Sequence, residues 1–204
     1  MDLPQEVNMK ENPQLNSSFQ LILSATEQLI EEKGCRQTTM QDIIDRTGLS
    51  KGAIYHYVTG KDELFGLILK ARTEQINTKF FEIVSKEETV GINDPLNVIA
   101  NGVAKHSTEQ DVTNKIFIYL LGRMDNQKVE EILKDVYSHS LAISTKWIEV
   151  GQEEGAIPLV VNAEKMASIF LTFMYGLRVQ STVNKDSSNL NMGDIYQVMF
   201  RSLQ

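Results

Sequence analysis

Apolar residues recur along most of this chain every three or four positions, which is the spacing of helices that pack on one side. Two short segments of this kind lie between Thr38 and Lys61, and a longer one continues from Lys61 to about Ser85. The pattern predicts an all-α fold. Further helices are expected over residues 94–107, 112–123, 126 to about 151, 162–183 and 194–203.

The segment from Thr38 to Lys61 predicts two short helices joined by a tight turn. Thr39 stands three residues before Asp42, the arrangement of a capped helix N-terminus whatever the function. Gly48 follows the apolar face of that helix and suits the left-handed backbone that ends it. Ser50 can cap the second helix, and together these signals predict a helix-turn-helix. The packed face of the second helix would be Ile54, Tyr57 and Val58.

The other face of that second helix would carry Lys51, Gly52, Tyr55 and His56. A plain solvated face would be richer in Glu and Lys than this combination of one cation, one glycine and two polar aromatic residues. A helix fits the major groove of DNA, where Lys, Tyr and His can donate to phosphates or base edges. A lysine taken alone is more often solvated surface, but the four residues together favour DNA binding.

A longer stretch around these helices resembles a known family. The sequence SKGAIYHYVTGKDEL (50–64) resembles the recognition helix and following turn of the tetracycline-repressor (TetR) family of bacterial transcription regulators. The sequence ILSATEQLIEEKGCRQTTMQDI (22–43) resembles the first helix of that family, its turn and the start of its second helix. The resemblance extends from about Ser18 to Leu69. It implies a three-helix DNA-binding domain over 15–62 and a helical ligand-binding and dimerisation domain over 63–204. The segment 1–14, which is polar and contains Pro4 and Pro13, is expected to be a flexible arm.

The resemblance also implies which residues lie at DNA. Lys51, Gly52 and Tyr55 would be nearest the bases, while Tyr57 and Lys61 would bind phosphates. For Tyr57, core packing with the hydroxyl turned outward is the alternative. The full set is Thr39, Gln41, Ser50, Lys51, Gly52, Ala53, Tyr55, His56, Tyr57 and Lys61.

Charge limits the type of DNA binding that we expect. The 204-residue chain has a net charge of −7 and a pI near 5.1, which argue against a general nucleic-acid coat. Seven basic and seven acidic residues balance between Gln14 and Arg72, so the rest of the chain carries the whole negative charge. A neutral head can present its few cations on one face, while an acidic body is repelled from DNA. We therefore expect salt-sensitive binding that does not depend on electrostatics alone.

Composition favours a soluble, cytoplasmic protein. Hydrophobic residues make up 42% of the chain, but no run of about 18 apolar residues occurs, and the N-terminus lacks the pattern of a signal peptide. Cys35 is the only cysteine, so an internal disulfide is excluded, and its neighbour Gly34 suggests that it packs near a turn.

Two other classes of protein are alternatives to a transcription regulator. A helical enzyme could carry a helix-turn-helix-like corner, but the glycines form no phosphate-binding pattern and no nucleophile signature occurs. The three histidines are too dispersed to suggest a metal site. No catalytic residue, metal ligand or cofactor is therefore predicted. The second alternative is a protein-binding adaptor that uses the apolar C-terminal helices.

The C-terminal helices favour a homodimer. The segment 166–177 is apolar almost all round and must be covered on more than one side, which a second copy of the chain can do. The resemblance implies the same arrangement, with two recognition helices about 34–36 Å apart on a roughly palindromic operator. The expected interface residues are Met166, Phe170, Leu177, Ile195, Val198 and Met199.

The family resemblance further implies a small-molecule effector, most simply an apolar or aromatic ligand of the body. Ordinary core packing is the alternative for each candidate lining residue. His106, His139 and Arg178 are polar groups that could orient such a ligand. The candidates for the lining are Phe117, Tyr119, Leu120, Met124, Tyr137, Trp147, Phe170, Phe173 and Met174.

The hypothesis for regulation is a population shift. Ligand would favour a dimer whose DNA-binding heads are wrongly spaced, with the long helix from Lys61 as the lever. Repression is the expected sign of regulation.

Overall fold

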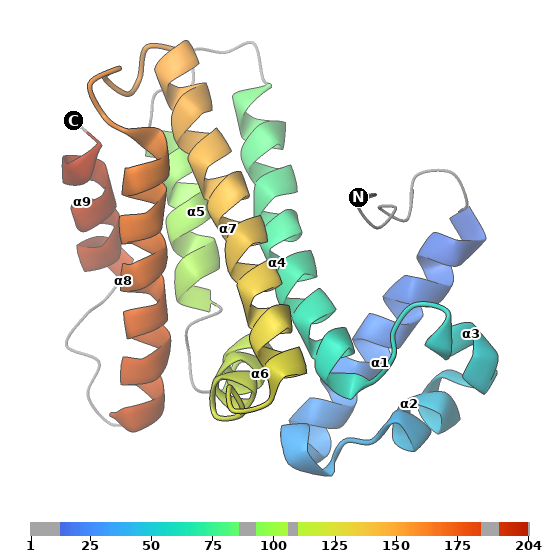
Figure 1. The fold of residues 1–204 in the computed structure, drawn as a ribbon. Coiled ribbons are helices and arrows are strands. Elements are labelled where there is room, and N and C mark those ends of the chain that lie inside the picture. Colours follow the sequence, from blue (N-terminus) through green and yellow to red (C-terminus); the bar gives the residue numbers. More distant parts are fainter. Residues whose placement is uncertain (1–12, 86–92, 106–109, 185–191, 204) are drawn as a thin grey trace. The chain divides into compact units, whose positions relative to one another are not determined.

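The computed structural model describes residues 13–85, 93–105, 110–184 and 192–203, and every regular element within these ranges is a helix (Figure 1). The predicted all-α class is confirmed. The chain divides into two compact units, one up to Leu64 and one from Phe65 onward. This boundary lies in the first turn of α4 (Lys61–Val84), the long helix expected from the sequence. Residues 1–12 of the predicted N-terminal arm lie outside the described residues.

Within the described ranges, no helix combines the length and the apolar character that crossing a bilayer requires.

The first unit contains α1 (Pro13–Gln37), α2 (Met40–Thr47) and α3 (Lys51–Tyr55). The helical path of α1 breaks at Gly34, whose φ of 78° is readily adopted only by glycine, and Cys35 is buried beside this break. The expected turn at this position is confirmed. The apolar core of the unit comprises Phe19, Ile22, Leu29, Ile30, Ile43, Ile54, Val58 and Leu64.

Helix α3 is shorter than the sequence pattern predicts. The Ser50 hydroxyl caps it by accepting a hydrogen bond from the Ala53 N–H at 3.2 Å, as expected, but the helix ends at Tyr55. Tyr57 and Val58 follow in the turn, although Val58 is still buried. The spacing of apolar residues identified positions that pack inward without showing that the helix stops between them.

The second unit continues α4 with five further helices. α6 (Val112–Leu121), α7 (Gln127–Glu153) and α8 (Ala163–Val183) lie where the sequence predicts them, and Asn126 and Asn162 cap α7 and α8 as expected. Two starts differ from expectation: α5 (Asn93–Lys105) begins one residue before the predicted cap, and α9 (Met192–Ser202) begins two residues early.

Helices α7 and α8 pack side by side, α9 packs on α5, and α6 contacts both α7 and α8 (Figure 1). One apolar cluster joins α4, α5, α7, α8 and α9, and it includes Trp147, whose indole N–H donates to the Asn77 side-chain oxygen at 2.9 Å. Burial of one large apolar side chain contributes about 1.5–3 kcal/mol. Other buried members of this cluster are Phe80, Leu96, Ile99, Ile148, Leu177, Met199 and Leu203.

Gly66 marks a close approach between α4 and α7. A Cβ atom at this position would lie 2.5 Å from Cγ2 of Ile132, a β-branched side chain with little freedom to move. The packing of the two helices therefore requires a residue without a side chain here.

We predict that Gly66→Ala destabilises the protein by about 0.5–2 kcal/mol, because overpacking costs about 1–3 kcal/mol and exceeds the gain of about 1 kcal/mol in helix propensity. Urea denaturation followed by circular dichroism measures the change. Thr78→Ala is the control, because Thr78 is exposed on the same helix, and it should be neutral or slightly stabilising. A Gly66→Ala variant as stable as the wild type would show that the contact is easily relieved.

Candidate DNA-binding surface and ligand cavity

The start of α2 is fixed by a reciprocal cap. The Thr39 hydroxyl accepts from the Asp42 N–H at 3.2 Å, and the Asp42 carboxylate accepts from the Thr39 N–H at 2.7 Å. The ammonium of Lys33 lies 2.6 Å from the same carboxylate. Lys33 first, and then Thr39, lower the pKa of Asp42 to about 2. The predicted cap is confirmed, and it holds α2 in one orientation before the turn.

The turn between α2 and α3 depends on Gly48. Its φ of 68° is left-handed, and its N–H donates to the Ile44 carbonyl at 3.0 Å, which closes α2. Because a side chain would strain this conformation, glycine is the residue that allows the sharp change of direction into α3.

The outward face of α3 carries the residues that the sequence assigned to it. Lys51, Gly52, Tyr55 and His56 are all exposed. The ammonium of Lys51 lies 5.5 Å from the centroid of the Tyr55 ring, a cation–π contact that orders both side chains. No atom lies within 4 Å of a Cβ built on Gly52, so another molecule can approach the backbone there.

The remaining predicted DNA-binding residues differ in their exposure and in their side-chain contacts. Gln41 is exposed, and its amide donates to Asp45 at 2.7 Å. Tyr57 is half-buried, with its ring 5.3 Å from that of Phe19, so packing is a large part of its role. Ala53 is half-buried as well.

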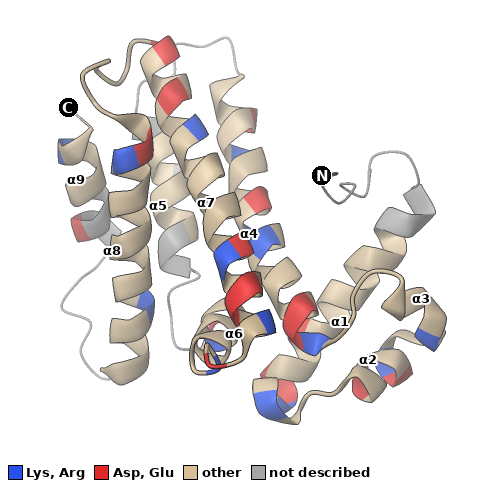
Figure 2. Ribbon diagram, viewed as in Figure 1, with Lys and Arg blue, Asp and Glu red and all other residues tan. Residues whose placement is uncertain are grey.

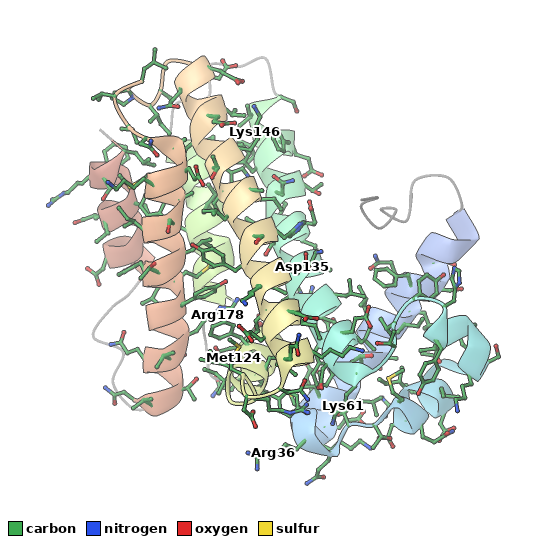
Figure 3. All side chains as sticks on the ribbon, viewed as in Figure 1. Arg36, Lys61, Met124, Asp135, Lys146 and Arg178 are labelled. Carbon is green, nitrogen blue, oxygen red and sulfur yellow. The ribbon has the colours of Figure 1, made fainter. Side chains whose placement is uncertain are left out.

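Lys61 has a structural role that was not predicted from the sequence. Its ammonium donates to the carbonyl oxygens of Cys35 at 3.1 Å, Arg36 at 3.2 Å and Thr38 at 2.9 Å (Figure 3). An ammonium has three N–H donors, and these three acceptors match that number. The side chain thus ties the start of α4 to the end of α1, and a phosphate would have to compete with these carbonyls.

Figure 2 marks the cations of the first unit in blue, and most of those described are engaged within the unit. Arg46 forms a two-fold hydrogen-bonded pair with Glu32, at 2.9 and 2.7 Å, which lowers the pKa of that carboxyl. Lys33 is paired with Asp42. Among the described cations of this unit, Arg36 and Lys51 are those for which no ion pair and no carbonyl contact of the side chain occurs.

The second unit contains a cavity between its helices. Its outline takes in about 460 Å³ of empty space, a volume that includes open solvent. Five helices contribute to its wall, and most of the lining is apolar or aromatic. The lining residues are Leu69, Arg72, Thr73, Ile76, Gly102, Phe117, Val136, Ser140, Met174, Tyr175 and Arg178.

Of the predicted ligand residues, Phe117 and Met174 line this cavity, and the rest lie elsewhere. Tyr137 is placed beside the cavity residue Tyr175, with its hydroxyl 3.2 Å from the Ser168 hydroxyl. The other candidates do not line this cavity: Trp147, Phe170 and Phe173 pack in the apolar cluster, Leu120 is fully buried, Met124 is exposed, and the Tyr119 hydroxyl accepts from Arg123. Their role in ligand binding stays a prediction.

Arg178 is the notable polar member of the cavity wall. It reaches from α8 to α6, where Nη1 donates to the Thr113 carbonyl at 3.2 Å and the guanidinium lies 5.4 Å from the centroid of Phe117 (Figure 3). Its Nε is buried and has no hydrogen-bond partner. Burial lowers the pKa of Arg178 and raises that of Tyr175.

The two histidines considered as ligand-orienting groups do not join Arg178. His139 is on α7 but does not line the cavity, and its Nε2 lies 3.2 Å from a carboxylate oxygen of Glu74. Burial lowers the pKa of His139. His106 lies outside the described residues.

The predicted dimer residues divide between buried and exposed positions. Leu177 and Met199 are buried within the chain, and Met166 and Phe170 are half-buried against the same apolar cluster, so a role of these four in a dimer interface stays a prediction. Val198 is 46% exposed, as an interface residue should be before assembly. The side chain of Ile195 lies outside the described part of the structure.

Comparisons with known proteins agree with this geometry. The family model for bacterial regulatory proteins of the tetR family matches residues 22–68, the segment that contains α2 and α3. Over longer ranges the chain is 21% identical to the HTH-type transcriptional regulator YfiR of Bacillus subtilis, covering 85% of this chain and 84% of YfiR. It is 26% identical to the HTH-type transcriptional repressor BepR of Brucella suis, covering 76% of each chain.

A TetR transcription regulator from Haloarcula marismortui has a similar structure, with a TM-score of 0.64 and 18% identity over 92% of this chain and 97% of that one. At this level of identity, the likeness establishes the fold.

We predict that Lys61→Met lowers the free energy of unfolding by about 1–3 kcal/mol, because the carbonyl groups at the end of α1 lose a charged donor. Thermal denaturation measures the change, and Lys79→Met, an exposed cation on the same helix, is the control. If Lys61→Met weakened DNA binding with no change in stability, the structural role would be wrong and the phosphate contact predicted from the sequence would be favoured.

Proposed function

This chain belongs to the TetR family of bacterial regulatory proteins and is a DNA-binding transcription regulator, and we propose that it is a repressor released by a small ligand. It would act in the cytoplasm, as a homodimer on a roughly palindromic operator. The observation that carries the proposal is the exposed face of α3, presented by a capped and rigid helix-turn-helix.

The face of α3 has the chemistry of a reading surface for the major groove. Tyr55 and His56 carry hydrogen-bonding groups on flat rings. The Lys51 ammonium forms no ion pair with a carboxylate of the described residues, so its charge can bind a phosphate. Since most other cations of the unit are engaged within it, sequence-independent attraction to phosphates should be modest. The proposed specificity therefore depends on contacts made by α3.

The exposed side of α8 supports assembly with a second copy. Ile169 is 52% exposed and Val183 is 78% exposed, and Gly176 lies midway between them, at seven residues from each. A seven-residue spacing keeps these positions on one line along the helix, and the glycine allows another helix to come close. No charge occurs between Lys165 and Arg178, and Figure 2 shows this uncharged stretch of α8.

The proposed interface stripe therefore consists of Ile169, Gly176, Val179 and Val183 on α8 with Val198 on α9. It differs from the stripe predicted from sequence by a rotation of roughly 100–115° about the axis of α8, which is more than a quarter turn, by the geometry of about 100° per residue. Apolar area of this kind exposed on a single chain is typical of surfaces that a partner covers.

Ligand release is supported by the continuity of α4. This helix begins at Lys61, which is bonded to the end of α1, and then supplies Leu69, Arg72 and Thr73 to the cavity wall. About twelve residues, or roughly 18 Å of helix, separate Lys61 from Thr73. A ligand that favours one position of α4 would in this way favour one placement of the DNA-binding unit, and it would weaken operator binding by its differential affinity for the two states.

We predict that Tyr55→Ala lowers affinity for the operator about 5- to 150-fold, the effect of losing about 1–3 kcal/mol of base recognition. Lys51→Ala should reduce the slope of log affinity against log salt by about 1, because one phosphate contact is lost. Fluorescence anisotropy at several salt concentrations measures both, with DNA from upstream of the gene and its neighbours.

Lys79→Ala is the matched control for this experiment, because it removes an exposed cation that does not belong to the DNA-binding unit. Circular dichroism shows whether each variant stays folded. If the α3 variants bound the operator as tightly as the control does, α3 would not be the reading helix.

We predict that Ile169→Glu weakens the dimer at least tenfold, since it places a charge in an apolar interface. Analytical ultracentrifugation over a dilution series measures the dissociation constant. Leu121→Glu is the control, because Leu121 on α6 is 43% exposed and lies outside the proposed stripe. Equal dissociation constants for the two variants would place the interface elsewhere.

A further inference from the structure

The guanidinium of Arg178 is built into the wall of the cavity without a full set of acceptors. Nη1 is bonded to the Thr113 carbonyl, whereas Nε is buried and unpartnered. A buried donor without an acceptor costs about 1–3 kcal/mol, and more when it belongs to a charged group. The structure therefore holds a donor that a bound molecule can satisfy.

The charge of Arg178 is also left without a close counterion among the described residues. Asp111 is near enough to influence its pKa, but that carboxylate caps α6 by accepting hydrogen bonds from the Thr113 and Asn114 N–H groups. Arg72 lines the same wall but is already bonded to Gln75, and among the described residues no Asp or Glu lines the cavity. The polar part of the wall thus favours an anion.

The geometry points to an effector that carries a carboxylate on an apolar body, with Arg178 as the residue that binds the carboxylate. A carboxylate can accept from Nε and the adjacent Nη2 of one guanidinium in a bidentate pair, while Nη1 stays on Thr113. A dianionic phosphate would need more donors than this edge supplies. The apolar body would lie against Leu69, Ile76, Val136 and Met174.

This inference rests on the proposed ligand-released repression, because it names the chemical class of the effector for that cavity. It refines the expectation of an apolar or aromatic ligand by adding a charged group. Two properties follow from it: the neutral amide of the same body should bind less tightly, and this preference should depend on Arg178.

The test is isothermal titration calorimetry of the full chain with two matched pairs of probes, 2-naphthoate with 2-naphthamide and decanoate with decanamide. The wild type should bind at least one acid ten or more times more tightly than its amide. Arg178→Met should abolish this preference, and Arg178→Lys should keep part of it, because the charge remains but the bidentate edge is lost.

Arg72→Gln is the matched control, because Arg72 lies on the same cavity wall but its Nη1 already donates to Gln75 at 2.8 Å. It should reduce the preference less than threefold. The quantity that tests the inference is the ratio of the acid affinity to the amide affinity. Partial unfolding of a variant would lower the affinity for both probes alike and leave this ratio unchanged. Equal binding of acid and amide by the wild type, or no binding of either pair, would overturn the inference.

Operator binding is measured separately on the same preparations. A protein that binds operator but shows no preference for the acids would overturn the carboxylate effector and leave the regulator standing. A protein that prefers the acids through Arg178 but binds no operator would support the carboxylate site and contradict the proposed repression.

Discussion

The ammonium of Lys61 is the interaction on which the organisation of the first unit depends. It joins three carbonyl groups where α1 ends to the point where α4 begins. These carbonyls follow the break of α1 at Gly34 and lie at the end of the helix, where carbonyl groups commonly lack a helical N–H partner. One side chain satisfies them and at the same time fixes the start of the helix that continues into the second unit.

Local signals made much of this fold predictable. The cap formed by Thr39 and Asp42, the left-handed Gly48, and the caps at Asn126 and Asn162 each depend on residues within four positions of one another. Such signals can be predicted from the sequence, because the geometry of a helix cap depends on residues that are close together in the chain. The exposed face of α3 was also predictable, since the alternation of packed and outward positions follows from helical spacing.

The cavity and the exposed stripe of α8 were less predictable because α8 is apolar on nearly every side. Hydrophobicity alone does not distinguish Phe170, which packs on the core, from Ile169, which faces outward, although the two are adjacent in sequence. The role of Lys61 was hidden for another reason: its acceptors are backbone carbonyls 23 to 26 residues away. In the case of Arg178, a charged residue within an apolar helix was the available signal.

Gly176 and Arg178 are two residues apart on α8. Positions at that separation lie about 200° apart around the helix axis and therefore face nearly opposite directions. A single turn of this helix therefore has the cavity on one side and the apolar stripe on the other. In the proposed dimer, a molecule that displaces this turn would change the surface against which the second subunit fits. Occupancy of one cavity would then alter the affinity of the other, so the two subunits would respond to effector cooperatively rather than as independent sensors.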